Sequence, residues 1–198
     1  MAIYSIFPTP VLHESEVVPR HLLLEIENKI VSNQKYSNEF GDSLQHTNNL
    51  KISALNKILY PLIDNLGYEL FGESKKWFIS QMWGNIMTKG GYQHRHSHSN
   101  SFISGVVYIK LPEGSPITRF HKRESSDGFH FSNSGKMTEY NSQSIEMGGV
   151  VEGDVVLFPS YLIHDVPQNQ SEGQRITVAF NAIPDKLDQQ GYSIKFSQ

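Results

Sequence analysis

The sequence contains no cysteine among its 198 residues. A disulfide framework, a thiolate metal site and a cysteine nucleophile are therefore all excluded. Long apolar runs are missing as well, since no stretch approaches the roughly 20 apolar residues that a membrane-spanning helix needs. The opening residues, Met1–Pro8, carry neither the basic flank nor the apolar core of a signal peptide. These absences lead us to expect a soluble cytoplasmic protein.

The sequence also lacks a large excess of charge of either sign. The formal net charge is −3, and the charged residues, 19% of the chain, form no long runs. Such a balance leaves no electrostatic footprint for nucleic acid or for an anionic membrane, so the sequence does not indicate a nucleic-acid partner, and we expect no membrane partner. A chain of this length with 38% hydrophobic residues is expected to form one domain, residues 1–198, with its own core.

The first third of the chain has the pattern of helices. Pro19 precedes an amphipathic stripe that begins at Leu22 and ends at Ile30, as in a short helix opened by proline. A stronger run keeps the 3.6-residue period: Leu55, Ile58, Leu59, Leu62, Ile63, Leu66 and Leu70. We expect Pro61 to kink or divide this second helix and Gly72 to end it. The helical support should span about residues 19–72.

From Trp77 onward the pattern changes to that of strands. Residues 77–87 alternate between two faces. Further strands are expected at 102–110, 117–120, 155–158 and 176–183. A helical start followed by short strands predicts a mainly β fold with N-terminal helices, a jelly-roll or cupin-like barrel over about residues 77–183. The polar segment 121–149 is expected to be a covering loop or an irregular hairpin.

Histidines form the first candidate site. His94, His96 and His98 alternate, and in a strand such residues share a face, while His164 follows another apolar strand. Imidazoles arranged in this way suit iron, zinc, copper or nickel. The alternative is a solvated histidine row with His164 in the core. The other histidines are expected at the surface: His13, His21, His46, His121 and His130.

An arginine completes the pattern. Arg175 and Thr177 lie two residues apart on an expected strand and therefore share a face. A guanidinium is the natural bidentate partner of a carboxylate, and a hydroxyl beside it can donate a further bond. The pair thus indicates an anionic ligand at the metal. The alternative is that Arg175 begins an exposed strand and forms a surface ion pair.

Four stretches in this order resemble the 2-oxoglutarate/iron(II) oxygenases of bacteria and their phages, within the prolyl-hydroxylase-like superfamily. They are His96–His98, Ser104–Tyr108, Gly153–His164 and Arg175–Asn181. The segment Ile6–Val11 also looks like the start of that family. The resemblance runs from near the N-terminus to residue 183 and is weakest around residues 121–148. It implies a double-stranded β-helix with Fe(II) and 2-oxoglutarate as cofactors.

The resemblance also implies a metal-ligand set of His96, His98 and His164. The superfamily usually carries Asp or Glu where this chain has His98, which widens the range of candidate metals. His94 would then contact one of the metal ligands without binding the metal itself, or it would line the entrance to the metal site. Asp165 is not expected to be a ligand, because neighbouring strand residues face opposite ways.

For the co-substrate, the resemblance assigns Arg175 to the far carboxylate of 2-oxoglutarate, with Thr177 and Tyr108 beside it. We add Asn85, which is expected on the same face as Gln81 and Trp83. No catalytic residue beyond the metal ligands is indicated.

The implied activity is hydroxylation of an unidentified small molecule or peptide with release of succinate and CO2. Two alternatives stay open: a cupin-type metalloenzyme that does not use 2-oxoglutarate, and a non-catalytic jelly-roll binding or structural module. The oligomeric state is open too, with a homodimer as one option.

Overall fold

The computed structural model describes residues 2–38, 41–122, 135–138 and 140–196. A seven-stranded sheet has the order β1-β9-β6-β11-β4-β3-β2, a four-stranded sheet has the order β5-β10-β7-β8, and β12 pairs with β13. The strands are β1 (Leu12–Glu14), β2 (Lys35–Asn38), β3 (Gly41–Thr47), β4 (Trp77–Met87), β5 (Gln93–His96), β6 (Ile103–Lys110), β7 (Arg119–His121), β8 (Ser144–Glu146), β9 (Val155–Pro159), β10 (His164–Val166), β11 (Arg175–Pro184), β12 (Lys186–Gln189) and β13 (Tyr192–Lys195).

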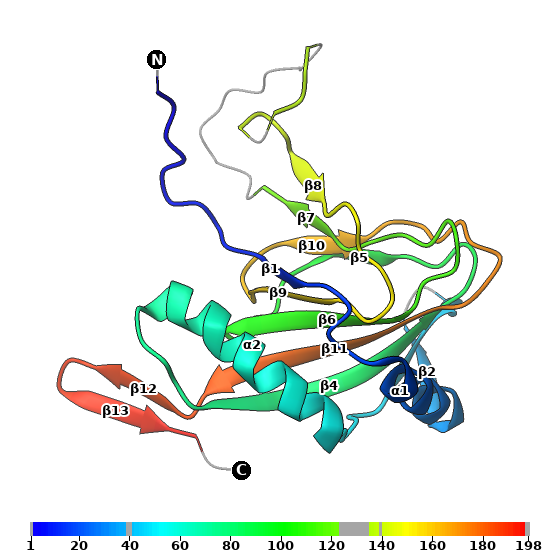
Figure 1. Ribbon diagram of the computed structural model, residues 1–198, viewed down its shortest axis with the longest axis horizontal. Helices are drawn as coiled ribbons and strands as arrows, with labels where there is room; N and C mark the ends of the chain where they lie inside the picture. The colour runs from blue at the N-terminus through cyan, green and yellow to red at the C-terminus, as the bar shows by residue number, and fades with distance from the viewer. Residues whose placement is uncertain (1, 39–40, 123–134, 139, 197–198) are drawn as a thin grey trace.

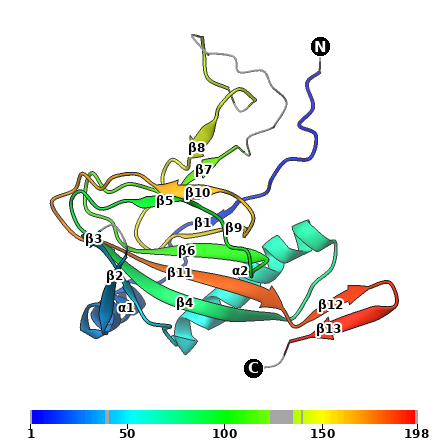
Figure 2. The same cartoon turned by 180° about the vertical axis from the view of Figure 1, so that it is seen from behind.

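The two larger sheets form the layers of a double-stranded β-helix. The four-stranded sheet faces one side of the seven-stranded sheet, and both helices cover the other side (Figure 1, Figure 2). Neighbouring strands in both sheets run antiparallel. The mainly β fold with N-terminal helices that the sequence predicts is confirmed.

The helices begin and end close to their predicted positions. Helix α1 (Arg20–Ser32) has Pro19 as its N-cap, and α2 (Ser53–Phe71) ends at Gly72, whose φ of 72° is left-handed. The expectation that Pro61 could divide α2 is wrong, because α2 is one helix of 19 residues. Pro61 lies on the exposed side, while buried leucine and isoleucine side chains before and after it pack on the sheet. This packing holds the helix together where proline removes one backbone bond.

Strand β11 shows how one sequence serves two environments. Its even-numbered residues, from Ile176 to Ala182, are buried in the core beneath the helices. Its odd-numbered residues as far as Asn181 line a cavity between the two sheets: Arg175, Thr177, Ala179 and Asn181. Phe180 also contributes to this cavity. A smaller apolar cluster around Tyr108 and Phe158 fills the rest of the space between the sheets. The two-residue period of the strand therefore separates structural from candidate functional side chains.

Two hairpins were not expected from the sequence, and a third strand pair shows how the segment 121–149 is arranged. The β2–β3 hairpin lies inside the region expected to be helical; its polar sequence lacks an alternating apolar pattern. The β12–β13 hairpin follows the expected end of the barrel. Within the segment 121–149, β7 pairs with β8, as expected for an irregular hairpin; residues 123–134 and 139 lie outside the described residues. No described helix is long and apolar enough to cross a membrane.

Candidate metal and anion site

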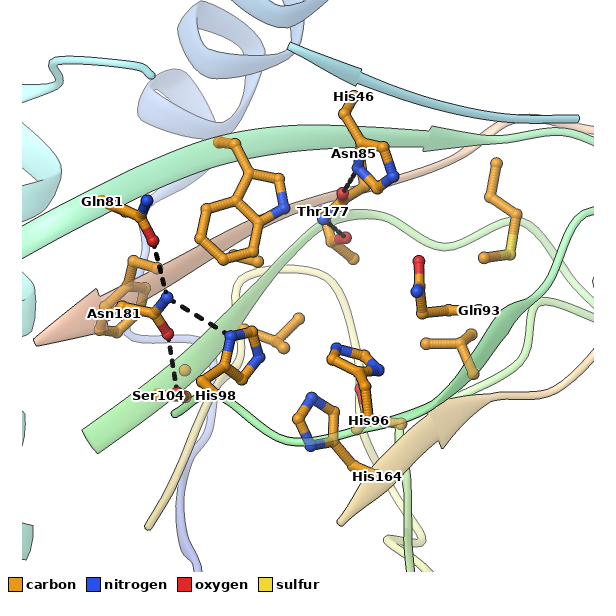
Figure 3. A pocket seen from close by; sticks show the side chains of 18 of the residues that line it. His46, Gln81, Asn85, Gln93, His96, His98, Ser104, His164, Thr177 and Asn181 are labelled. Atoms are coloured by element: carbon orange, nitrogen blue, oxygen red, sulfur yellow. Dashed lines mark hydrogen bonds between the residues drawn. The ribbon is translucent and has the colours of Figure 1, made fainter. Parts of the chain in front are cut away.

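A cavity of about 290 Å³ opens between the two sheets. Strands β3, β4, β5, β6, β10 and β11 all contribute to its wall. Three histidine side chains gather at one side of it, while His46 lies apart from them beside Asn85 on the seven-stranded sheet (Figure 3). The cavity thus combines groups that bind metals with groups that bind anions.

Three histidines meet in this cavity. One ring nitrogen from each of His96, His98 and His164 lies within 4.8 Å of the others. His96 and His164 are cross-strand partners on β5 and β10, and their ring centroids are 4.3 Å apart. His98 follows the end of β5, where its backbone N–H donates to the carbonyl of Ser160 over 2.9 Å. The structure therefore brings together the three residues expected as ligands.

His94 does not join this group. The four residues of β5 from Gln93 to His96 lie opposite only three residues of β10, from His164 to Val166, so the pairing contains a bulge. The bulge places Gln93 and His96 together in the cavity and leaves His94 exposed outside it, beside Tyr92. The expected row of three histidines on one face is therefore wrong at its first member. The backbone carbonyl of His94 serves the site, by accepting a 2.7 Å bond from His96 Nδ1.

Two of the three clustered histidines have the protonation that a metal requires. Burial, together with the neighbouring His96, lowers the pKa of His98 to about 4 and that of His164 to about 3. Both rings are therefore neutral near pH 7, as metal ligands must be. Backbone carbonyls bind Nδ1 of His96 and of His164 at 2.7 and 2.9 Å, which leaves each Nε2 lone pair free. These residues fit a metal ion.

Arg175 supplies the only formal charge among the described residues that line the cavity. Its side chain is buried, and burial lowers its pKa. Nε donates to the Pro116 carbonyl at 2.8 Å, Nη1 to Thr177 Oγ1 at 3.4 Å, and the guanidinium lies 5.6 Å from the Tyr108 ring centroid. No carboxylate of the described residues pairs with it. The alternative of a surface ion pair is wrong, and the cavity is suited to an anion.

Thr177 and Asn85 continue the polar wall beside this guanidinium. Asn85 Nδ2 donates to Thr177 Oγ1 at 3.3 Å, so Thr177 already accepts two bonds and its own hydrogen can point into the cavity. His46 Nδ1 lies 2.7 Å from Asn85 Oδ1, and burial lowers the pKa of His46. The expectation that His46 lies at the surface is wrong, because the β2–β3 hairpin carries it into the cavity wall.

Tyr108 has the interior placement expected for it, but its side chain is set back from the cavity. It faces the interior, as Ser104 does, but it does not line the cavity. Its hydroxyl donates to Thr118 Oγ1 at 2.9 Å and accepts from the Thr118 backbone N–H at 3.3 Å. Thr118, which the sequence did not single out, lines the cavity in its place.

The remaining histidines have mixed outcomes. His21 is exposed as expected, whereas His13 is half-buried with Nε2 at 2.6 Å from Asp154 Oδ2. His121 is buried, contrary to expectation, and its Nε2 lies 2.9 Å from Asp165 Oδ2. Asp165 also accepts two bonds from Arg119, at 2.9 and 2.8 Å, which keeps it away from the cavity. His130 lies outside the described residues.

Comparison with known sequences gives a family match. Residues 81–181, half of the chain, match the family model described as "Putative 2OG-Fe(II) oxygenase". The match covers the strands that line the cavity from Gln81 to Asn181 and contains all three clustered histidines. No curated protein sequence matches the chain.

Solved structures share the fold at low sequence identity. An oxidoreductase of the 2OG-Fe(II) oxygenase family from Burkholderia pseudomallei is 12% identical with a TM-score of 0.59, covering 87% of this chain and 83% of its own. HygX from Streptomyces hygroscopicus, solved with nickel and 2-oxoglutarate bound, is 14% identical with a TM-score of 0.59 and coverages of 89% and 83%. The epimerase SnoN, in complex with Fe3+, alpha ketoglutarate and nogalamycin RO, is 10% identical with a TM-score of 0.63 and coverages of 89% and 80%.

Proposed function

The chain belongs to the 2OG-Fe(II) oxygenase family, and from that premise we propose that it hydroxylates a substrate while converting 2-oxoglutarate and O2 to succinate and CO2. One oxygen atom of O2 enters the substrate and the other enters succinate. The observation that carries the proposal is the buried Arg175, which has no carboxylate partner among the described residues and shares one cavity with three clustered histidines.

The histidines would hold the iron. His96 and His164 offer Nε2 lone pairs, because backbone carbonyls fix the proton of each ring on Nδ1. His98 supplies the third imidazole, in place of the carboxylate usual in the superfamily. When bound, iron and 2-oxoglutarate supply the oxidising chemistry, and the protein supplies position and enclosure.

The anion-binding groups would hold 2-oxoglutarate. Arg175 offers its guanidinium to the far carboxylate, and Thr177 donates its hydroxyl hydrogen to the same group. Asn85 fixes the direction of that hydroxyl through its own bond to Thr177 Oγ1. The hydroxyl of Tyr108 is already bound to Thr118. We therefore propose that the Tyr108 ring holds the Arg175 guanidinium in place through a cation–π contact.

The substrate would enter past Trp83, Gln81, Gln93 and His46, which line the cavity on the seven-stranded sheet and on β5. These side chains offer an aromatic face and uncharged hydrogen-bonding groups; among the described lining residues there is no carboxylate and no lysine. Such a wall favours an uncharged part of a small molecule or of a peptide.

The test is succinate production from 2-oxoglutarate with Fe(II) and O2 over a substrate panel, alongside metal content of untagged protein and 2-oxoglutarate affinity without O2. Succinate formation that requires both Fe(II) and O2 supports the proposal. A protein that binds metal but no 2-oxoglutarate would instead be a cupin-type enzyme. A protein that binds neither would be a non-catalytic module.

A further inference from the structure

The three clustered histidines differ in what determines their tautomer. His96 and His164 each place Nδ1 against a backbone carbonyl, which can only accept, so their protons are fixed on Nδ1. His98 instead places Nδ1 at 3.4 Å from the side-chain amide of Asn181. An amide can donate through its nitrogen or accept through its oxygen. The tautomer of His98 therefore depends on which end of Asn181 faces it.

In one orientation this contact opposes metal binding. Asn181 Nδ2 donates to His98 Nδ1 and to Gln81 Oε1, at 3.4 and 3.1 Å, while Oδ1 accepts from Ser104 at 2.8 Å (Figure 3). A His98 ring that accepts at Nδ1 carries its proton on Nε2. The figure shows the second ring nitrogen of His98 on the side of His96 and His164. A proton there would cover the lone pair that a metal needs.

The opposite orientation of the Asn181 amide is available. Oxygen and nitrogen ends of an amide have nearly the same shape, so the group can turn over within the same space. Asn181 Nδ2 would then donate to Ser104 Oγ, and Oδ1 would accept from His98 Nδ1. Gln81 is exposed, so its amide is free to turn and donate to the same oxygen.

In this orientation the Ser104 hydroxyl can no longer donate to Asn181, and a relay, a chain of serine hydroxyls, supplies another acceptor for its hydrogen. Ser104 Oγ lies 2.8 Å from Ser160 Oγ, and either can donate. Ser160 donates to Ser101 at 2.9 Å, and Ser101 donates to the backbone carbonyl of Ile103 at 3.0 Å. Every hydroxyl in the relay then has an acceptor, and the chain ends on a carbonyl. Ser104, Ser160 and Asn181 are buried, so water cannot replace these partners cheaply.

We propose that Asn181 is a positioning residue for the metal site: backed by the Ser104–Ser160–Ser101 relay, it presents its amide oxygen to His98 Nδ1 and so directs the Nε2 lone pair to the metal. The inference rests on the proposed metal centre. His98 stands where the superfamily usually has a carboxylate ligand. The side chain of Asn181 would orient His98 in the way that backbone carbonyls orient His96 and His164.

Histidine ring NMR on the Zn2+-loaded protein tests the tautomer directly, because Zn2+ is diamagnetic and needs no turnover. We expect His98 to carry its proton on Nδ1 and to bind the metal through Nε2. A His98 proton on Nε2 in the loaded protein would overturn the proposal. This spectrum is recorded on the unaltered chain, so it shows whether His98 binds through Nε2 even where a variant fails to fold, and the role of Asn181 is tested by substitution.

Two substitutions at Asn181 should shift Zn2+ affinity differently. Asn181→Leu keeps a similar volume but offers no acceptor, and we expect about 10- to 100-fold weaker binding, the usual effect of losing such a partner. Asn181→Asp offers only acceptors towards His98, so it should bind Zn2+ at least as tightly as the unaltered chain. Asn65→Asp, on the exposed face of α2, adds the same charge away from the cavity and should leave affinity unchanged.

The outcomes separate this inference from the proposed function. Wild-type affinity in Asn181→Leu, or equal losses in Asn181→Leu and Asn181→Asp, would overturn the role of Asn181 while leaving the oxygenase proposal standing. A chain that binds Zn2+ with the expected pattern but never consumes 2-oxoglutarate would overturn the oxygenase proposal and leave the role of Asn181 intact.

Discussion

At the scale of single residues, the cavity combines three clustered imidazoles with one buried guanidinium. A divalent metal held by neutral ligands keeps its full charge, and Arg175 adds another positive charge in the same enclosed space. Water is a poor substitute for an anion there, because the guanidinium is buried and has no carboxylate partner among the described residues. A dianionic ligand such as 2-oxoglutarate would offset both charges at once.

Loss of one clustered histidine should remove most of the bound metal. Replacing His96, His98 or His164 with Ala takes away one ligand of three, and we expect the affinity for a divalent metal to fall at least 100-fold, more than loss of a supporting partner costs. His94→Ala is the matched control, since its ring lies outside the cavity and should leave metal content nearly unchanged. Metal analysis after dialysis measures both. Loss in His94→Ala with retention in His98→Ala would show a different ligand set.

Arg175 should control affinity for 2-oxoglutarate and leave metal affinity nearly unchanged. Hydrogen bonds to charged groups contribute about 1.5–3 kcal/mol, so Arg175→Ala should weaken 2-oxoglutarate binding by roughly 10- to 100-fold. Arg175→Lys keeps the charge but loses the planar fork, and it too should bind more weakly than the unaltered chain. Calorimetry on the metal-loaded protein without O2 measures the effect. Unchanged 2-oxoglutarate affinity in Arg175→Ala would refute this assignment while the metal site survived.

His98→Asp would recreate the ligand set that is common in the superfamily. We expect weaker iron binding despite the added negative charge, because Asp is shorter than His and its oxygen does not reach as far from the same backbone position. Iron affinity and 2-oxoglutarate decarboxylation should be measured side by side on both proteins. Equal or better values in His98→Asp would show that the site accepts either ligand.

At the scale of elements, one irregularity in β5 decides which histidines meet. A regular strand would place His94 and His96 on the same face. The bulge opposite β10 brings Gln93 into the cavity instead and leaves His94 outside it. His98 lies beyond the strand and is held by the carbonyl of Ser160, at the turn that leads from β9 towards β10.

The close approach of α2 to β4 depends on a glycine. A Cβ built on Gly67 would lie 2.4 Å from the buried indole ring of Trp77. Gly67→Ala normally favours a helix, but here the clash should prevail and destabilise the fold by about 1–3 kcal/mol. We expect the melting temperature to fall by roughly 2–4 °C for each kcal/mol. Gly148→Ala, where a Cβ meets no atom within 4 Å, is the control; an equal or higher melting temperature in Gly67→Ala would contradict this packing.

At the scale of the whole molecule, the metal site joins the two sheets. His164 and His96 belong to the four-stranded sheet, and His98 is anchored beside the end of β9 in the seven-stranded sheet. A metal held by all three should therefore stabilise the folded chain against unfolding, since the unfolded chain has no such site.

Metal addition should raise the melting temperature, and the shift should grow with the logarithm of the metal affinity. At a free metal concentration 100 times the dissociation constant, binding contributes about 2.7 kcal/mol to the free energy of unfolding. Removal by a chelator should reverse the shift, and His164→Ala should show almost none of it. Thermal unfolding with and without Co2+ measures the difference. An identical shift in His164→Ala would place the stabilising metal elsewhere.

Much of this arrangement follows from sequence patterns that are local in range. The 3.6-residue period predicts both helices, and the two-residue period of 77–87 and 176–183 predicts the strands and the shared face of Arg175 and Thr177. Alternation alone could not rank His94 against His98 as a ligand. Only the resemblance to the oxygenase family made that choice before the fold was considered.

Tertiary structure decided what depends on contacts between distant residues. The β5 bulge arises from pairing with β10. Arg175 is buried because the two sheets close over it. His46 reaches the cavity because it lies on the β2–β3 hairpin, whose polar sequence has no apolar period. The sequence by itself determined which side chains each strand presents together, because that depends on backbone geometry. Which of those faces is enclosed, and which amide meets His98, depended on how the sheets close on each other.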